Sequence, residues 1–334
     1  MKDKPPLIII GAGLSGLYAA YLLQNNFNII ILEARERLGG RIFTHKGHDL
    51  GPSWIWPHQK HILSLLQELN LETFSQYIQG DALYDAPEGL QKFKAPSSAP
   101  SYRLKGGLGQ LIQALEKKVP QEIIHLGQEV LSITQEKEEL ILKTRNKSYR
   151  ASYVLSTLAP RLAAEKIHYS PALNEDTKAQ MQNIPTWMGH AAKCVIEYPQ
   201  AFWKDQSLSG FVYSPQGPLG EIHDACTQDQ AALFGFVHSN ATRENLLDAI
   251  KAQMMRIFPQ QSIQNIYLLD WQEERFSASS EDKKGLSVHP SYGHSLHHFQ
   301  GKLIFMGTES AYEEGGYLEG AIHSAKKVAQ ELSE

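Results

Sequence analysis

The sequence predicts an α/β protein whose N-terminal part is a Rossmann-like βαβ unit, and three observations lead to this prediction. Four consecutive apolar residues, Leu7–Ile10, are typical of a short buried strand. A GxGxxG run over residues 11–16 follows them and leads into the helical apolar period of Leu14–Gln24. A second apolar run, Asn28–Leu32, supplies the next strand. A strand, a glycine-rich turn, a helix and a strand in this order are typical of dinucleotide binding.

The three glycines of the GxGxxG run meet different steric requirements. Gly11 makes the tight turn, Gly13 lets the backbone approach a pyrophosphate, and Gly16 allows the helix to pack close to the strand. The helix directs its unpaired N–H groups and the positive end of its dipole at phosphate. A glycine-bearing turn in an ordinary α/β domain is the alternative. The residues expected at this end of a dinucleotide site are Gly11, Ala12, Gly13, Leu14, Ser15 and Gly16.

An acidic residue ends the second strand. Glu33 follows Gly11 by 22 residues, the position from which a carboxylate holds a ribose 2′-hydroxyl. The same carboxylate would repel a 2′-phosphate, so NADP is disfavoured and NAD and FAD remain. Ala34 and Arg35 are expected beside it. The turn Gly39-Gly40-Arg41 can bring backbone and a guanidinium to the diphosphate from the other side.

The composition is that of a globular protein. A length of 334 residues favours two domains over one. The net charge of −4 does not provide the positive surface that nucleic-acid binding requires. The two cysteines, Cys194 and Cys226, exclude a disulfide framework. No apolar run approaches the ~20 residues of a transmembrane helix, and none resembles a signal segment. The sequence therefore predicts a cytoplasmic protein without a membrane partner, and leaves open whether it is an oligomer.

Two motifs resemble the flavin-containing amine oxidases. The first is ExxxxxGGR, which runs from Glu33 to Arg41 after the GxGxxG turn. The second, GTES–x(5)–GYLEGA, covers Gly307–Ala321. The resemblance implies FAD as the cofactor and a Rossmann-like FAD-binding domain of the glutathione-reductase type. It also implies an inserted α+β substrate domain with a mixed sheet, which is trimmed here because the segment Gln76–Tyr102 is short.

The resemblance further implies how the chain is divided. The FAD-binding domain is expected in three parts, residues 1–75, 103–167 and 271–334, and the substrate domain in two, residues 76–102 and 168–270.

Several segments take flavin-binding roles from the resemblance. The turn Gly51-Pro52-Ser53-Trp54 is expected to pass beneath the flavin ring, Val130 to contact adenine, and Trp271 to pack against the flavin. At the C-terminal motif, Gly316 and the following helix N-terminus are expected at the ring carbonyls, and Tyr317 as one wall of an aromatic substrate cage. The other residues expected at the cofactor in this motif are Gly307, Thr308, Glu309 (near the ribityl and phosphate groups), Leu318 and Ala321.

Lys193 is the first candidate for a catalytic residue. It lies in a strand-like run from Gly189 in which Ala191, Lys193, Val195 and Glu197 share one face. A lysine among small and apolar residues costs desolvation energy unless it has a partner or water. The run resembles the amine-oxidase strand whose lysine holds a water against flavin N5. A lysine that reaches solvent from an edge strand is the alternative.

Apolar periods of 3.6 and 2 residues predict the remaining helices and strands in order. Helices are expected over Ile62–Leu69, within Arg103–Leu115, and over Thr242–Phe258 and Leu318–Leu332. Strands are expected at His48–Leu50, in a hairpin of Ala82–Tyr84 and Leu90–Phe93, and at Ile123–His125, Glu129–Gln135, Glu139–Thr144, Tyr153–Leu158, Leu208–Val212, Ile222–Asp224, Ala232–Val237, Asn265–Trp271 and Lys302–Gly307.

The chain differs from the resembled family at two positions that are expected near the flavin. The position of a flavin-linked cysteine falls near Ser280, and that of a second cage tyrosine near Glu281. Noncovalent FAD is therefore expected, with Tyr317 aided by Trp54 or Trp56. No metal is expected, because the histidines of 289–298 lack carboxylates and HExxH spacing.

The function implied is that of an FAD-dependent amine oxidase. Hydride would pass from the α-carbon of a small-molecule amine to flavin N5, and O₂ would reoxidise the flavin with release of H₂O₂. Two alternatives stay open. One is a flavin-dependent desaturase or dehydrogenase of the same superfamily, and the other is a non-catalytic FAD-binding protein.

Overall fold

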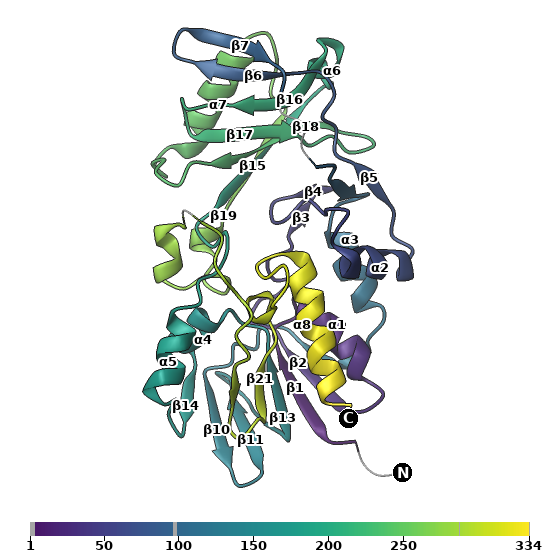
Figure 1. The fold of residues 1–334 in the computed structure, drawn as a ribbon, viewed down its shortest axis with the longest axis vertical. Coiled ribbons are helices and arrows are strands. Elements are labelled where there is room, and N and C mark those ends of the chain that lie inside the picture. The colour runs from purple at the N-terminus through teal and green to yellow at the C-terminus, as the bar shows by residue number, and fades with distance from the viewer. Residues whose placement is uncertain (1–3, 96–98, 287, 334) are drawn as a thin grey trace.

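A computed structural model describes residues 4–95, 99–286 and 288–333. The molecule is elongated, with a six-stranded sheet at one end and a seven-stranded sheet at the other (Figure 1). Residues 96–98, in the segment 76–102 that is expected to belong to the substrate domain, lie outside the described residues.

The six-stranded sheet contains the predicted βαβ unit. Its strand order is β20-β21-β13-β1-β2-β9, and all neighbours run parallel except β20 and β21. The strands are β1 (Pro6–Ile10), β2 (Asn28–Leu32), β9 (Ile124–His125), β13 (Tyr153–Ser156), β20 (His297–His298) and β21 (Leu303–Phe305). Because a parallel sheet is covered on both faces, alternate residues of β1 enter different cores: Leu7 and Ile9 one, Ile8 and Ile10 the other.

Helices from opposite ends of the chain cover the first face. Helix α1 (Leu14–Leu23) packs against α8 (Leu318–Glu331), and both contribute to the same core as α3 (Gly109–Glu116). Figure 1 shows the purple α1 beside the yellow α8. Since β1, α3 and α8 surround α1, this helix is apolar on nearly every side.

A small sheet covers the second face. Its order is β12-β11-β10-β14, and the core behind it includes Ile133 and Leu140. The strands are β10 (Ser132–Glu136), β11 (Glu139–Lys143), β12 (Ser148–Ala151) and β14 (His168–Ser170).

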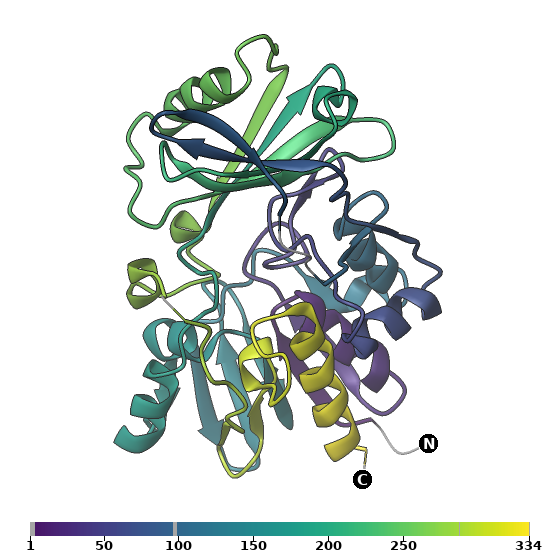
Figure 2. The ribbon, with the colours of Figure 1, turned by 45° about the horizontal axis from the view of Figure 1, so that its top comes forward.

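The seven-stranded sheet has the order β19-β15-β18-β17-β16-β6-β7. Its strands are β6 (Asp81–Ala86), β7 (Gly89–Phe93), β15 (Ala192–Tyr198), β16 (Leu208–Tyr213), β17 (Leu219–Asp224), β18 (Ala231–Val237) and β19 (Asn265–Asp270). Helix α7 (Leu246–Ile257) lies on the outer face of this sheet (Figure 2). It shares a core there with Ala192, Cys194 and Ile196 of β15. The predicted alternation along β15 is therefore confirmed.

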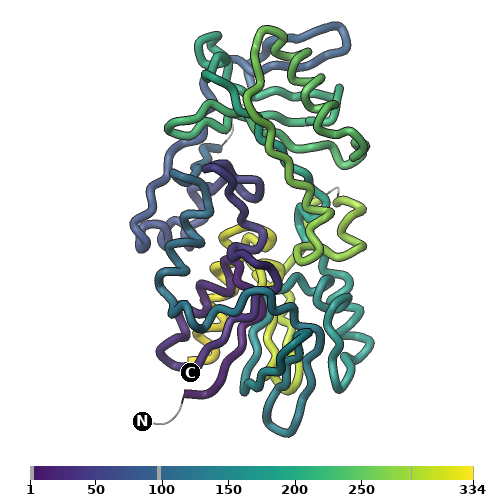
Figure 3. Tube along the Cα trace, turned by 180° about the vertical axis from the view of Figure 1, so that it is seen from behind, coloured from purple at the N-terminus to yellow at the C-terminus, as the bar shows by residue number. Residues whose placement is uncertain are grey.

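The chain passes between the two large sheets more than once. Segments before β6 and after β7 form one set of connections, and those before β15 and after β19 form another on the opposite side (Figure 3). The remaining elements are α2 (Lys60–Glu68), α4 (Pro160–Lys166), α5 (Glu175–Gln182), α6 (Phe202–Asp205), η1 (Gln121–Ile123), η2 (Trp271–Glu273), η3 (Glu281–Lys284), η4 (Thr308–Ser310), β3 (Thr44–His45), β4 (His48–Asp49), β5 (Thr73–Ser75) and β8 (Tyr102–Leu104).

Two expectations from the sequence need correction. The helix expected over Thr242–Phe258 begins only at Leu246, because Asn245 takes a left-handed conformation at φ +52° and ends the preceding turn. The strand expected at Glu129–Gln135 begins at Ser132, where pairing with β11 and β14 starts.

Candidate active site

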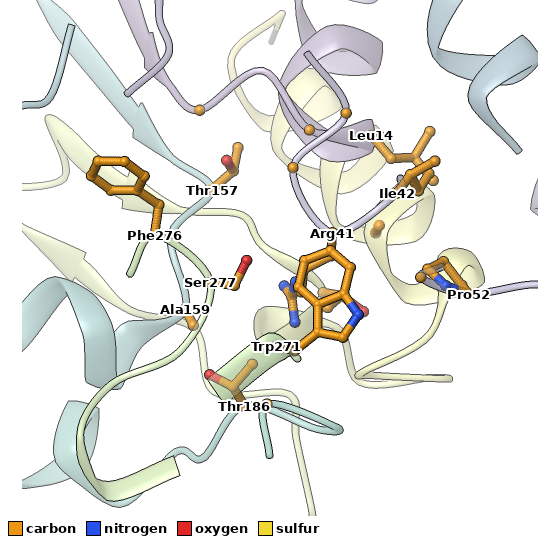
Figure 4. A pocket seen from close by; sticks show the side chains of 18 of the residues that line it. Leu14, Arg41, Ile42, Pro52, Thr157, Ala159, Thr186, Trp271, Phe276 and Ser277 are labelled. Atoms are coloured by element: carbon orange, nitrogen blue, oxygen red, sulfur yellow. The ribbon is translucent and has the colours of Figure 1, made fainter. Parts of the chain in front are cut away.

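One cavity of about 620 Å³ extends from the β1–α1 turn to the inner face of the seven-stranded sheet. Figure 4 shows Thr157, Phe276 and Ser277 on one side of it and Leu14, Ile42 and Pro52 on the other. Residues that the sequence assigns to a dinucleotide and residues that it assigns to catalysis therefore line the same space.

The β1–α1 turn depends on its glycines. Gly11 has φ +100°, and a Cβ there would lie 2.3 Å from Thr157 Oγ1. A Cβ on Gly16 would lie 2.0 Å from the Gly11 carbonyl oxygen, so this contact between helix and strand requires glycine. A Cβ on Gly13 would meet its nearest atoms only at 3.8 Å. The turn thus leaves backbone open to the cavity at Gly13, as a diphosphate requires.

Glu33 lies buried at the end of β2. Its carboxylate accepts hydrogen bonds from the backbone N–H of Ala12 at 2.8 Å and of Arg35 at 2.9 Å. These contacts hold the carboxylate against the glycine turn, where it lines the cavity beside Val130. The position suits a ribose hydroxyl.

Cationic side chains gather at the same end of the cavity. Arg35, Arg41, Lys166 and Arg275 line it. Arg41 donates to both carboxylate oxygens of the fully buried Glu309, at 2.6 and 3.1 Å. This bidentate pair joins the N-terminal and C-terminal motifs and fixes the direction of the guanidinium.

Lys193 lies at the opposite end, on β15, which pairs with a strand on each side. It is 2% exposed, and Nζ donates to the Gly51 carbonyl at 2.9 Å and to Ser53 Oγ. Nζ also lies 4.3 Å from the centre of the Phe234 ring. Burial lowers the pKa of Lys193 from 10.5 to about 7, and nearby Asp49 opposes part of that fall. The edge-strand alternative is thereby excluded.

Aromatic rings form the walls near Lys193. Trp54 and Trp56 are 6.5 Å apart between ring centres, and Trp56 meets Tyr317 edge-on at 5.8 Å. Behind Tyr317, His289 stacks in parallel at 5.0 Å. Trp271 lines the cavity and donates from Nε1 to the Leu50 carbonyl at 2.9 Å.

Most of the residues predicted for the site line this cavity. They are Gly11, Gly13, Leu14, Ser15, Glu33, Ala34, Arg35, Gly40, Arg41, Gly51, Pro52, Ser53, Trp54, Val130, Lys193, Trp271, Thr308, Gly316, Tyr317, Leu318 and Ala321. Four others lie behind the lining: Ala12 bonds Glu33, Gly16 packs on Gly11, Gly307 packs near Thr157, and Glu309 pairs with Arg41.

The expected places of a flavin-linked cysteine and a second cage tyrosine lie outside the cavity lining. Ser280 donates to Glu165, and Glu281 begins the exposed turn η3. Sequence reasoning missed Trp187, Glu221 and other lining residues. The alternation of β17 and β18 could have placed Glu221 on the inner face, once strand pairing was known.

A Rossmann-like unit and a lysine-bearing sheet share one cavity, which is the arrangement of a dinucleotide-binding protein with a second part that faces the bound group. The chain belongs to the flavin containing amine oxidoreductase family, whose model matches residues 14–101 and 93–333. It is an FAD-dependent amine oxidase, and the predicted family, fold class, cofactor and type of enzyme are confirmed. The function implied by the resemblance is thus favoured over the desaturase and non-catalytic alternatives.

Individual relatives agree with this membership. Mouse amine oxidase [flavin-containing] B is 25% identical, with 99% of this chain and 86% of that protein aligned. A putrescine oxidase solved with putrescine bound has a TM-score of 0.83 at 20% identity, covering 99% of both chains. Cyclohexylamine oxidase from Brevibacterium oxydans has a TM-score of 0.79 at 18% identity, covering 99% of this chain and 100% of the other.

The residues of the cavity fit FAD. The carboxylate of Glu33 suits the ribose, the opening at Gly13 suits the diphosphate, and the arginines supply opposite charge. Within the part of the chain that the structure describes, no helix combines the length and apolar character needed to cross a bilayer.

Proposed function

We propose that this chain binds FAD noncovalently along the cavity and oxidises a small amine between Lys193 and Tyr317. The observation that carries the proposal is the continuity of one cavity from Glu33 to Lys193. When bound, FAD supplies the hydride acceptor, and O₂ then reoxidises it with release of H₂O₂. The substrate classes named for the structural neighbours, putrescine and cyclohexylamine, support a small amine.

Lys193 is proposed to hold a water molecule at the reacting end of the cavity. Its Nζ is fixed by the Gly51 carbonyl and Ser53 Oγ, so its remaining hydrogen-bonding capacity points at a defined place. A lysine with a pKa of about 7 is largely neutral above that pH. It therefore does not repel an incoming amine as an ordinary ammonium would.

Tyr317 is proposed to orient the amine. Its ring is held between the edge of Trp56 and the parallel ring of His289, so it presents a fixed aromatic wall to the cavity. Trp54, Trp56 and Tyr317 also exclude water from the reacting carbon. Trp271, tied to the Leu50 carbonyl, is proposed to pack against the flavin.

The other proposed features concern the whole chain. We propose a division into an FAD-binding domain (1–75, 103–167, 271–334) and a substrate domain (76–102, 168–270). It is supported by the strands, because those of the six-stranded sheet all fall in the first set of ranges and those of the seven-stranded sheet in the second. A cytoplasmic location is proposed from the low cysteine content alone.

The proposal is tested with purified protein and a panel of amines, polyamines and amino acids scored by peroxide formation. We expect a yellow protein that releases FAD on heating, and at least one amine that bleaches the flavin without oxygen. Flavin that stays attached to the denatured chain would contradict noncovalent binding. A colourless protein that takes up no added FAD would contradict the whole proposal.

A further inference from the structure

Glu197 of β15 is a buried carboxylate that the proposed function does not use. It is 6% exposed and is not among the residues that line the cavity. Among the described residues, four hydrogen-bond donors reach its two oxygen atoms. Oε1 accepts from His48 Nε2 at 3.1 Å and Gln230 Nε2 at 3.3 Å, and Oε2 accepts from Asn265 Nδ2 at 2.6 Å and Tyr267 OH at 3.1 Å. Because hydrogen bonds to an ionised carboxylate are strong, these donors hold it in one position.

The imidazole of His48 is the donor that comes from the N-terminal part of the chain. Burial opposes ionisation of Glu197, but hydrogen bonds from Asn265 and Tyr267 outweigh it and hold the pKa of Glu197 below its usual value. Burial also lowers the pKa of His48, so this imidazole is neutral at pH 7. A carboxylate can only accept, so the imidazole hydrogen lies on Nε2, and Nδ1 has no partner among the described residues. Glu197 therefore fixes the buried His48 ring through one hydrogen bond.

His48 begins a segment that runs along the inner face of β15. Side chains two residues apart in a strand point to the same side, and three successive inward side chains of β15 meet residues 48–53. They are Glu197 at His48, Val195 in one core with Leu50, and Lys193 at the Gly51 carbonyl and Ser53 Oγ. The segment and the strand therefore run in opposite directions with one fixed alignment. Glu197 and Lys193 hold its two ends about 13 Å apart along the strand.

The same segment also binds the indole of Trp271. Trp271 Nε1 donates to the Leu50 carbonyl at 2.9 Å, between the two ends of the segment. A shift of residues 48–53 along β15 would therefore displace the hydrogen-bond partners of Lys193 and the Trp271 indole together. The proposed function places both of these side chains at the flavin.

We propose that Glu197 is a positioning residue: through His48 it fixes the alignment of residues 48–53 on β15, and so the place of Gly51 and Ser53 at Lys193. Glu197 does not touch the amine, since it lies behind the cavity lining. Its loss should therefore slow flavin reduction and leave amine binding nearly unchanged. This inference rests on the proposed function, because it takes Lys193 as a residue that acts at the flavin.

The test measures flavin reduction by stopped flow without oxygen, in FAD-loaded enzyme mixed with cyclohexylamine or putrescine. Glu197→Gln keeps the side-chain shape but turns one acceptor into a donor that faces other donors. We expect a limiting reduction rate about fivefold lower, with a half-saturating amine concentration within about twofold of wild type, because small displacements at reacting groups act on the rate. His48→Ala should show the same loss, whereas His48→Gln, which keeps a donor to Glu197, should retain most of the rate.

A double-mutant cycle with Lys193→Met distinguishes positioning from a general structural effect. If Glu197 acts through Lys193, Glu197→Gln should change the reduction rate by less than about twofold once Lys193 is replaced. Asp85→Asn is the matched control, because Asp85 is another buried carboxylate of the same sheet, bonded to Ser214 and to Arg256 of α7. It should lower the melting temperature as Glu197→Gln does, with a reduction rate within about twofold of wild type.

The possible results bear on different statements. Wild-type reduction rates in both Glu197→Gln and His48→Ala overturn the positioning role and leave the proposed function standing, as does a His48→Gln enzyme that is no faster than His48→Ala. A loss that persists undiminished in the Lys193→Met background, or an equal loss in Asp85→Asn, shows a general structural effect and also overturns the role of Glu197. A wild-type flavin that neither amine reduces contradicts the proposed small-amine substrate and this inference together.

Discussion

Lys193 is a buried base whose amino group donates hydrogen bonds to two groups of the 51–54 turn. Replacing it with methionine keeps the volume and removes the amino group that donates to Gly51 and Ser53. We expect Lys193→Met to retain FAD and to slow flavin reduction or reoxidation at least about tenfold. Stopped-flow absorbance of the flavin measures both steps. Lys251→Met, on the exposed side of α7, is the control, and an unchanged rate in Lys193→Met would remove Lys193 from the site.

The lowered pKa of Lys193 also makes stability depend on pH. In the unfolded chain the amine binds its proton up to about pH 10.5, whereas the folded protein loses it near 7. Between these values the unfolded state binds more protons, so the free energy of unfolding rises with pH. For FAD-free protein we expect a rise of about 2 kcal/mol from pH 7 to pH 9, measured by urea unfolding. The rise should be absent in Lys193→Met; an equal rise there would assign it to other groups.

At the scale of elements, two glycines of the β1–α1 turn have different roles: Gly16 allows close packing, and Gly13 leaves room for FAD. Gly16→Ala would place a Cβ 2.0 Å from the Gly11 carbonyl oxygen, so we expect a loss of about 1–3 kcal/mol in unfolding free energy. Gly13→Ala meets only ordinary contacts in the protein and should unfold like wild type, but it should bind FAD more weakly. Denaturant unfolding and fluorescence titration with FAD distinguish them. Equal effects of the two substitutions in both assays would contradict this separation.

The same elements show how far the sequence predicts the fold. The βαβ unit, the β6–β7 hairpin and helix α8 were predictable because each has a clear apolar period and turn residues of its own. Helices α4 and α5 were missed, although Pro160 at the first turn of α4 and Asn174 as N-cap of α5 are recognisable signals. Their apolar faces are short, so periodicity alone does not reveal them.

The site was predictable only in part for a different reason. Lys193 and Tyr317 lie in motifs of their own, whereas Glu221 and Phe236 reach the cavity through strand pairing. Pairing between strands is a non-local property, and no single stretch of sequence contains it. The contact of Glu309 with Arg41, 268 residues away, was hidden in the same way.

At the scale of the whole molecule, the Arg41–Glu309 pair joins segments from the two ends of the chain. Arg41→Met would leave the fully buried carboxylate of Glu309 without its cation, so we expect a loss of about 3 kcal/mol in unfolding free energy. FAD-free protein is used, because Arg41 also lines the cavity. The control Arg150→Met breaks exposed pairs with Glu136 and Glu139 and should cost less than about 0.5 kcal/mol. Comparable losses in both variants would refute the buried pair as the cause.

The placement of β21 and α8 has a consequence for biosynthesis. Strand β21 pairs with β13, and α8 packs on α1, so the six-stranded sheet lacks the strand beside β13, and α1 lacks one covering helix, until residues 303–331 have left the ribosome. A nascent chain therefore exposes apolar surface of α1 throughout most of translation. FAD binding therefore comes late in synthesis. A chain that terminates before β21 would depend on chaperones and would not retain the yellow flavin.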